Sequence, residues 1–328
     1  MGALNLPQRL KMLGVIGVMA VASQAALAAP TDQYQQAAGF YRHMVGNTMV
    51  TAVYDGYIDL DPKHLAGIPH EEIQEHILHE YQKAAPFVQT AVNAFLVDDG
   101  KQLVLIDSGS SDCFGPTMGR MVDNIRAAGY TPEEVDAVLL THLHPDHACG
   151  VTLPGGKRAF TNATVWAADP DANYWLDVKQ EGSLPEDQRP FFKMARDAIA
   201  PYSDVGKFRT FDEGDSITSG IQVVPSNGHT PGHTSYLLSS GGEKLLLWGD
   251  IVHVHSVQLP HPEVTIAVDV DPKAAVASRI RLFAEAASER WLVAAAHLPF
   301  PGIGHLRKED KGYSWVPVEY RNPANSER

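Results

Sequence analysis

Cysteine is scarce in this sequence, since only two of its 328 residues are cysteines. A scaffold held by several disulfides needs more of them, and so does a cysteine-rich zinc ribbon or an iron–sulfur cluster. These classes are therefore excluded for a single chain. A metal site would have to be built from imidazoles and carboxylates.

Basic residues are also few, because 26 Lys and Arg stand against 39 Asp and Glu, for a net charge of −13. A protein that binds nucleic acid neutralises phosphates with clustered Lys and Arg. We therefore expect no nucleic-acid partner. The content of 44% hydrophobic and 20% charged residues is typical of a globular chain with a substantial core.

Long apolar runs are missing beyond the first thirty residues, so we expect no segment there to cross a membrane. The N-terminus has a basic start at Arg9 and Lys11, an apolar stretch over 12–22 and the small-residue sequence Ala26-Leu27-Ala28. This pattern predicts a cleaved signal peptide over 1–28 and a domain over 29–328, with a retained membrane anchor as the alternative. In a bacterial cell the destination would be the periplasm or the medium, without a stable membrane anchor.

Short apolar runs alternate with helical patterns along the rest of the chain. Runs of this length, bounded by turn residues, predict buried strands of an α/β protein. Helices are predicted over 69–84, from a capping box at 131–134, and from Asp271 onward with Val276 and Ile280 on the buried side. The segment 166–211 lacks strand alternation and is predicted to be an insertion of helices and loop. The apolar runs cover 103–106, 137–140, 221–224, 245–248 and 292–296.

Histidine is abundant by contrast, with fifteen in the chain. The segment 141–147 reads Thr-His-Leu-His-Pro-Asp-His and directly follows a predicted strand. In extended backbone His142 and His144 point the same way, and the turn at Pro145 directs Asp146 and His147 to another side. Two groups of ligands suit two adjacent cations better than one.

Further Asp and His residues follow other predicted strands. Asp107 comes after the run 103–106, His229 after 221–224, Asp250 after 245–248, and His297 after 292–296. Ligand sites of α/β sheets collect at the carboxyl ends of strands. The sequence therefore predicts that these side chains meet.

The order of these motifs resembles the metallo-β-lactamase superfamily from about residue 92 to 297. The resemblance implies an αββα sandwich. Several further segments look like the methyl parathion hydrolase family, which implies a secreted, commonly dimeric hydrolase with two metal ions. These segments are 114–117, 228–234, 297–305, 311–313 and 316–318.

The resemblance implies seven metal ligands, divided between two divalent ions that we expect to be zinc. Imidazoles and carboxylates suit this ion. The ligands of one ion are His142, His144 and His229, those of the other are Asp146, His147 and His297, and Asp250 bridges both.

The implied mechanism uses a hydroxide shared by the two ions, with Asp250 and Asp146 as the catalytic carboxylates. Asp107 and His233 are expected to orient the ligands instead of binding metal. For Asp107, a carboxylate that only caps a turn is the alternative.

The substrate pocket is predicted from three aromatic residues, Phe114, Trp175 and Phe192, which match pocket positions of the family. After Asp250 the chain carries His253 and His255 where the organophosphate hydrolase is apolar, and strand alternation would place both on one side. An imidazole on the pocket wall could bind a carbonyl or ring oxygen. We therefore expect small neutral lactones or aryl esters as substrates, with organophosphate triesters as a side activity.

Two other functions stay open from the sequence. One is a dedicated organophosphate hydrolase, and the other is a noncatalytic metal-binding protein of the same fold. For Cys113 and Cys149 we expect two buried free thiols, with a disulfide as the alternative. His70, His76 and His79 are expected to form a solvated helix face, and His261 has no partner pattern.

Overall fold

The computed structural model describes residues 2, 36–83, 86–182, 186 and 189–321. The predicted signal peptide over 1–28 lies outside these described residues, apart from residue 2. Residues from Ala38 onward form one compact unit. No helix in the described ranges is long and apolar enough to cross a membrane.

The first sheet has seven strands in the order β1-β2-β4-β5-β6-β9-β10. Its first four strands are antiparallel neighbours, whereas β5, β6, β9 and β10 run parallel. The strands are β1 (Phe40–Val45), β2 (Thr48–Leu60), β4 (Val88–Asp98), β5 (Leu103–Ile106), β6 (Ala137–Leu139), β9 (Thr164–Ala168) and β10 (Phe208–Phe211).

The second sheet has six strands in the order β11-β12-β13-β15-β16-β17. The pair β13–β15 is parallel and the other neighbours are antiparallel. The strands are β11 (Ile221–Pro225), β12 (Thr234–Ser240), β13 (Glu243–Leu247), β15 (Leu292–Ala294), β16 (Ile303–Lys308) and β17 (Tyr313–Pro317). Two small two-stranded sheets pair β3 (Leu65–Ala66) with β14 (Thr265–Ile266), and β7 (Thr152–Leu153) with β8 (Lys157–Arg158).

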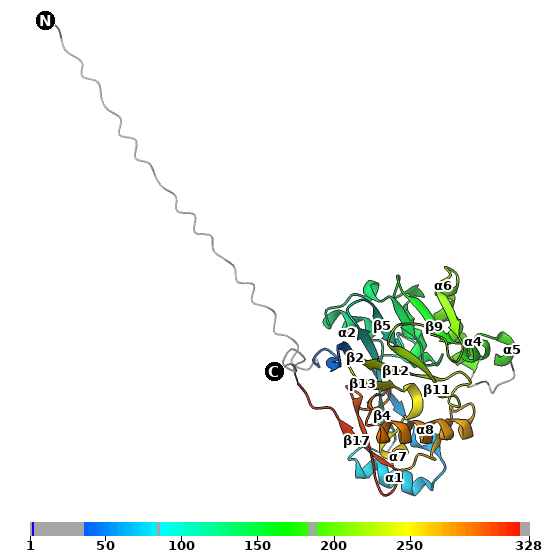
Figure 1. The fold of residues 1–328 in the computed structure, drawn as a ribbon. Coiled ribbons are helices and arrows are strands. Elements are labelled where there is room, and N and C mark those ends of the chain that lie inside the picture. Colours follow the sequence, from blue (N-terminus) through cyan, green and yellow to red (C-terminus); the bar gives the residue numbers. More distant parts are fainter. Residues whose placement is uncertain (1, 3–35, 84–85, 183–185, 187–188, 322–328) are drawn as a thin grey trace. The chain divides into compact units, whose positions relative to one another are not determined.

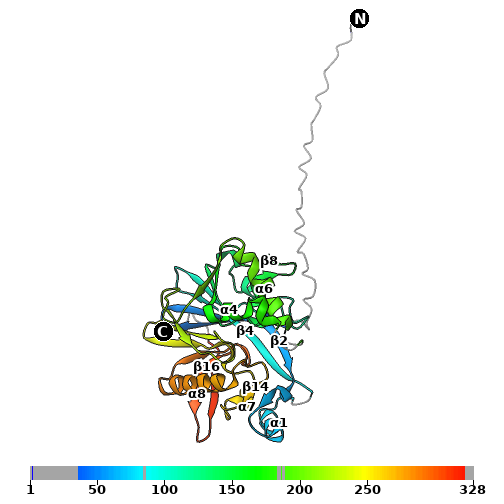
Figure 2. The ribbon, with the colours of Figure 1, turned by 90° about the vertical axis from the view of Figure 1, so that its right-hand side faces the viewer.

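The two sheets pack face to face and helices cover their outer faces (Figures 1 and 2). The central cluster joins apolar side chains of both sheets, among them Phe95, Ile106, Tyr236 and Leu247. The predicted αββα sandwich is confirmed. The helices are α1 (His70–His79), α2 (Met121–Ala127), α3 (Pro145–Ala148), α4 (Asp169–Trp175), α5 (Val178–Glu181), α6 (Arg189–Ser203), α7 (His255–Gln258) and α8 (Pro272–Ser288).

Helix α8 begins where Asp271 predicted it, since the Asp271 carboxylate accepts a hydrogen bond from the Ala274 N–H at 3.0 Å. Its buried face was predicted one residue out of phase, because Ile280 is 49% exposed and Arg279 is buried. The Arg279 guanidinium donates to the carbonyls of Ile251, Pro262 and Val264, so a basic side chain takes the inner position.

Two other element predictions were right only in part. The capping box at 131–134 is present, but it opens only a 3₁₀ turn (Pro132–Glu134), because the backbone at Val135 is already extended toward β6. The segment 166–211 is helical in its middle, but its ends belong to β9 and β10 of the first sheet. Parallel strands do not need polar alternation, which is why the pattern missed β9.

Candidate metal centre

Five strand ends deliver the candidate side chains to one place between the sheets. Asp107 follows β5, the segment 141–147 follows β6, and His229, Asp250 and His297 follow β11, β13 and β15. Asp107 adopts a φ of +58°, a conformation unusual for a residue other than glycine. Its carboxylate accepts hydrogen bonds from the Thr141 N–H at 2.7 Å and the Thr141 hydroxyl at 2.9 Å. The strained turn after β5 thus positions the loop after β6.

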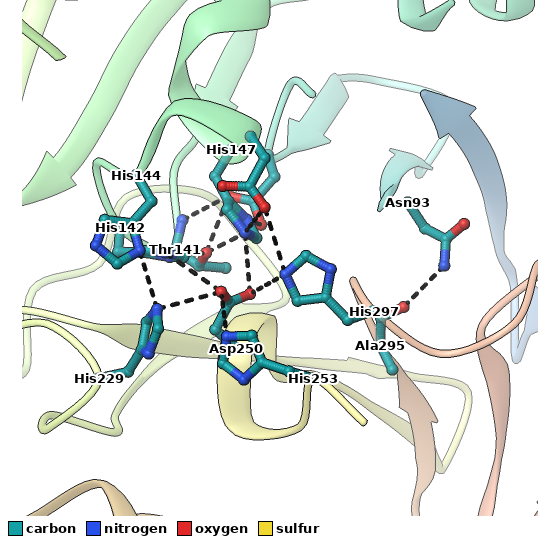
Figure 3. A network of polar contacts seen from close by, with 12 residues as sticks. Asn93, Thr141, His142, His144, His147, His229, Asp250, His253, Ala295 and His297 are labelled. Carbon is teal, nitrogen blue, oxygen red and sulfur yellow. Dashed lines mark hydrogen bonds and ion pairs between the residues drawn. The ribbon is translucent and has the colours of Figure 1, made fainter. Parts of the chain in front are cut away.

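The Asp250 carboxylate lies at the centre of the site, with imidazoles on both of its oxygens (Figure 3). Its Oδ1 lies 2.9 Å from the His147 Nε2 and 3.0 Å from the His297 Nε2. Its Oδ2 lies 3.2 Å from the His229 Nε2 and 3.6 Å from the His142 Nε2. One carboxylate therefore faces two separate groups of ligand atoms.

These groups have the composition of two adjacent metal sites. In each group the ligand atoms lie within 4.8 Å of one another and every residue is buried. The Nε2 atoms of His142 and His147 and the Asp250 Oδ1 have no hydrogen-bond partner among the described residues. Buried polar atoms without partners are costly, and two cations would satisfy them. The first group consists of His142, His144, His229 and Asp250. The second group consists of Asp146, His147, Asp250 and His297.

The remaining ring nitrogens are held by a surrounding layer of acceptors. The His147 Nδ1 lies 2.8 Å from the Asp107 Oδ2, and the His297 Nδ1 lies 2.8 Å from the Ala91 carbonyl oxygen. The His229 Nδ1 lies 2.8 Å from the Asp269 Oδ1. In each case the Nδ1–H donates outward, which turns the Nε2 toward the centre as the atom that would bind a cation once it is deprotonated.

The protonation of the histidines makes cation binding depend on pH. Burial, followed by the neighbouring His147, lowers the pKa of His142 well below 6.5, so this ring is neutral. Burial would lower the pKa of His229 too, but hydrogen bonds to Asp250 and Asp269 outweigh it and raise the pKa to about 9. A cation must therefore displace a proton at His229, and its affinity must fall as the pH falls.

His233 supports the site through the backbone of Asp250. Burial, followed by the nearby His229, lowers the pKa of His233 to about 3, so its ring is neutral. The Nε2 accepts the Asp250 N–H at 2.9 Å, and the Nδ1 lies 3.1 Å from the Ser226 carbonyl oxygen. It orients the shared carboxylate without entering either ligand group.

Two supporting carboxylates were missed from the sequence. Asp269 holds His229, and Asp171 accepts the N–H groups of Leu143 at 2.7 Å and Gly232 at 3.0 Å. A Cβ on Gly232 would meet the Asp171 nitrogen at 2.4 Å, so only glycine fits this approach. Asp269 lies two residues before Asp271, which was interpreted only as a helix start, and Asp171 lies in the segment 166–211, which was predicted only as an insertion.

The structure changes which aromatic residues are assigned to the wall of the site. Trp175 contacts His144 with ring centroids 4.8 Å apart, but Phe192 is fully buried in the core under α6. The preceding Phe191 contacts His144 at 5.7 Å and Phe114 at 6.1 Å instead. Consecutive helix residues face about 100° apart, so the helical phase of α6, which the sequence left open, decides between the two phenylalanines.

His253 and His255 do not share a side. The His253 Nε2 lies 3.1 Å from the Asp250 Oδ2, and its ring stacks on His297 with centroids 5.1 Å apart. His255 opens helix α7, so the alternation expected for a strand ends after His253. Only His253 joins the site.

A disulfide links Cys113 to Cys149, and the expectation of two free thiols was wrong. Cys149 follows α3, the helix that carries Asp146 and His147, and Cys113 lies beyond the Asp107 turn. Hydrogen bonds also hold these two loops together. The Ser108 N–H donates to the His147 carbonyl at 2.9 Å, and the Ser108 hydroxyl donates to the same carbonyl at 2.7 Å. Sequence spacing gives no measure of this approach.

The fold is an αββα sandwich, and two groups of histidine and aspartate ligands share one aspartate at the strand ends. These features together define a class of metal-binding α/β proteins. The profile of the Metallo-beta-lactamase superfamily matches residues 88–297, which is more than half of the chain. The chain belongs to this superfamily.

Individual relatives agree with this assignment. The crystal structure of the hydrolase AbOPH, in the beta lactamase superfamily, is 43% identical with a TM-score of 0.84, over 88% of this chain and 100% of that one. AidC, a dizinc quorum-quenching lactonase in complex with a product, shares the fold at 24% identity and a TM-score of 0.79, over 87% of this chain and 99% of that one. An N-acyl homoserine lactonase of Bacillus sp is 26% identical over 121 residues, which are 37% of this chain and 40% of the lactonase.

Proposed function

We propose that this protein is a metal-dependent hydrolase that opens lactones or cleaves aryl esters. The observation that carries the proposal is the position of Asp250, whose two oxygens face two buried ligand groups at 2.9–3.6 Å. The similarity to the hydrolase AbOPH and to the Bacillus lactonase supports the reaction class.

The two groups would hold two divalent cations, with zinc favoured by their imidazole and carboxylate donors. When bound, such a pair of ions supplies a water-derived nucleophile at neutral pH and polarises the scissile carbonyl. The first ion would be held by His142, His144 and His229, the second by Asp146, His147 and His297, and both by Asp250.

Asp146 is the second carboxylate that we assign to catalysis. Burial raises its pKa, but His147 and His297 beside it outweigh this effect and hold the pKa below its usual range. Its Oδ2 lies 3.5 Å from the Nε2 atoms of both histidines. An ionised carboxylate here can bind a cation with one oxygen and pass a proton from the attacking water to the leaving alkoxide with the other.

His253 would contribute to substrate choice as a hydrogen-bond acceptor. The Asp250 carboxylate only accepts, so the His253 Nε2–H donates to it and the Nδ1 carries a lone pair. Burial, opposed by Asp250, lowers the pKa of His253 to about 4, so the ring stays neutral. The Nδ1 is buried and has no partner among the described residues. It suits an N–H or a departing O–H of the substrate, and not a carbonyl oxygen as the sequence suggested.

Aromatic side chains and charge narrow the substrate further. Trp175, Phe191 and Phe114 form a chain of ring contacts that begins at His144, and such surfaces bind aryl or acyl groups. The net charge of −13 opposes anionic substrates such as nucleic acids. Small neutral lactones and aryl esters fit both features.

The setting of the enzyme is part of the proposal. We infer export to the periplasm or the medium after cleavage of the signal peptide over 1–28, with the mature chain as a homodimer. The resemblance of short segments such as 114–117 and 228–234 to the methyl parathion hydrolase family is the ground for both points, and for hydrolysis of organophosphate triesters as a side activity. The internal disulfide fits an oxidising compartment.

A substrate panel tests the proposal. On zinc-loaded protein we expect a higher kcat/KM for dihydrocoumarin, phenyl acetate or an acyl-homoserine lactone than for methyl parathion. In His253→Leu we expect the preference for the best of these substrates over methyl parathion to fall roughly 2–12-fold, since a hydrogen bond between neutral groups is worth about 0.5–1.5 kcal/mol. Initial rates for each substrate give these values. A wild-type preference for methyl parathion would show a dedicated organophosphate hydrolase instead.

A further inference from the structure

A second group of metal-ligand residues lies outside the centre described above. Glu72 and His76 occupy adjacent turns of one face of α1, and His261 follows α7. Three potential ligand atoms of these residues lie within 4.8 Å of one another. The sequence reading, which left His76 on a solvated face and His261 without a partner, was wrong for both. We propose that these residues form a third divalent-cation site, which fastens α1 to the segment after α7.

The spacing of the ligand atoms fits a cation. The His261 Nε2 lies 3.0 Å from the His76 Nε2 and 3.4 Å from the Glu72 Oε1. Two ligands bound to zinc at 2.0–2.1 Å in tetrahedral geometry lie roughly 3.3 Å apart. The nitrogen and oxygen atoms around Asp250 show the same spacing, from 2.9 to 3.6 Å.

The position of the proton on the His261 ring favours a bound cation over a simple hydrogen bond among these three residues. The His261 Nδ1 lies 3.0 Å from the Glu263 Oε1, so its N–H donates to that carboxylate. In the neutral ring the Nε2 then carries a lone pair, and it faces the Glu72 carboxylate, which also only accepts. A proton on the His76 Nε2 can satisfy one of these acceptors, whereas a cation satisfies all three groups. Glu263 accepts the Nδ1–H of His261 in the same way that Asp107 accepts the Nδ1–H of His147.

The surrounding structure holds the ligands in place before a cation binds. Ile73 and Ile77 of α1 pack in one apolar cluster with Val254, Val257 and Val264, and α1 lies beside α7 in both ribbon views (Figures 1 and 2). The His261 N–H donates to the Val257 carbonyl at 2.9 Å, and its carbonyl accepts from Val264 at 3.0 Å. The group is partly exposed, with 21% of the His261 side chain and 41% of the Glu72 side chain accessible. Water can therefore complete the coordination, as it does where a protein supplies three ligands.

Zinc binding to the full protein tests the site. Protein stripped with a chelator is titrated with zinc alone, and bound zinc is counted by equilibrium dialysis. We expect three ions per wild-type chain, and one fewer in His76→Gln and in His261→Gln. His79→Gln is the matched control, because His79 lies on the same helix, its side chain is 83% exposed and it lies outside the three-residue group, so it should keep all three ions.

A fourth variant reports on orientation alone. Glu263→Gln leaves the three ligands in place but removes the carboxylate that orients His261, so the zinc concentration for half-saturation of the third ion should rise roughly 10–100-fold. The other two ions should be unaffected, which also shows that the variant is folded. Two ions in the wild type, or three in both His76→Gln and His261→Gln, would overturn the proposal. None of these outcomes depends on which ester or lactone the enzyme hydrolyses.

Discussion

Replacing Asp250 with alanine lowers kcat/KM for every lactone and aryl ester by about 10²–10⁴-fold. Each 1.36 kcal/mol of lost transition-state stabilisation corresponds to a factor of ten in rate, so this range corresponds to about 3–5 kcal/mol. The loss is large because Asp250 contacts both ligand groups, through Oδ1 to His147 and His297 and through Oδ2 to His229. Initial-rate kinetics on zinc-loaded protein measure it.

A matched control separates this effect from a general loss of structure. Asp98→Ala makes the same substitution at a carboxylate whose side chain accepts a hydrogen bond from the Tyr130 hydroxyl at 3.0 Å, outside both ligand groups. It should keep wild-type kcat/KM within a few-fold. Full activity in Asp250→Ala would refute the role of Asp250 as a shared catalytic ligand. The hydrolysis would then take place elsewhere, and the centre would be noncatalytic.

Removing the disulfide by the double substitution Cys113→Ala and Cys149→Ala lowers the free energy of unfolding by about 4 kcal/mol. The bond closes a loop with a sequence separation of 36 residues, and the entropy of closing such a loop gives this magnitude. Chemical denaturation at a fixed zinc concentration measures the change. Reductant should destabilise the wild type by a similar amount and leave the double variant unaffected.

Loss of the disulfide should affect the activity of the metal centre less than it affects the free energy of unfolding. The hydrogen bonds from the Ser108 hydroxyl to the His147 carbonyl and from the His147 Nδ1–H to the Asp107 carboxylate remain, and they join the same two loops without the disulfide. We therefore expect kcat/KM within a few-fold of wild type at temperatures where the variant is folded. A loss of stability below 1 kcal/mol would show that the disulfide adds little to these contacts.

The metal ligands were predictable from the sequence because each follows a short buried strand. Strand ends in an α/β sheet meet at a known edge, so Asp250 and His297 could be brought together with the motif at 142–147 without coordinates. The fold followed from the same pattern and from the family resemblance. Position along the chain predicted that these residues meet, and the family resemblance supplied their division between two ions.

Other features depend on helical phase and on contacts between distant segments. Phe191 and Phe192 are adjacent, and only the packing of α6 decides which one reaches His144. His76 and His261 are separated by 185 positions, and Cys113 and Cys149 sit in loops whose approach no spacing rule gives. Asp171 and Asp269 resembled ordinary helix-start aspartates because their partners are backbone and imidazole groups elsewhere in the chain.

The most direct test of the binuclear centre is a zinc titration of activity in the His76→Gln variant, which isolates the Asp250 centre from the third site. Metal-stripped protein receives increasing zinc while bound ions and turnover of the best lactone or aryl ester are measured on the same samples. We predict no turnover without metal and a maximum at two ions per chain. Full turnover in stripped protein, or a maximum at one ion per chain, would contradict the account.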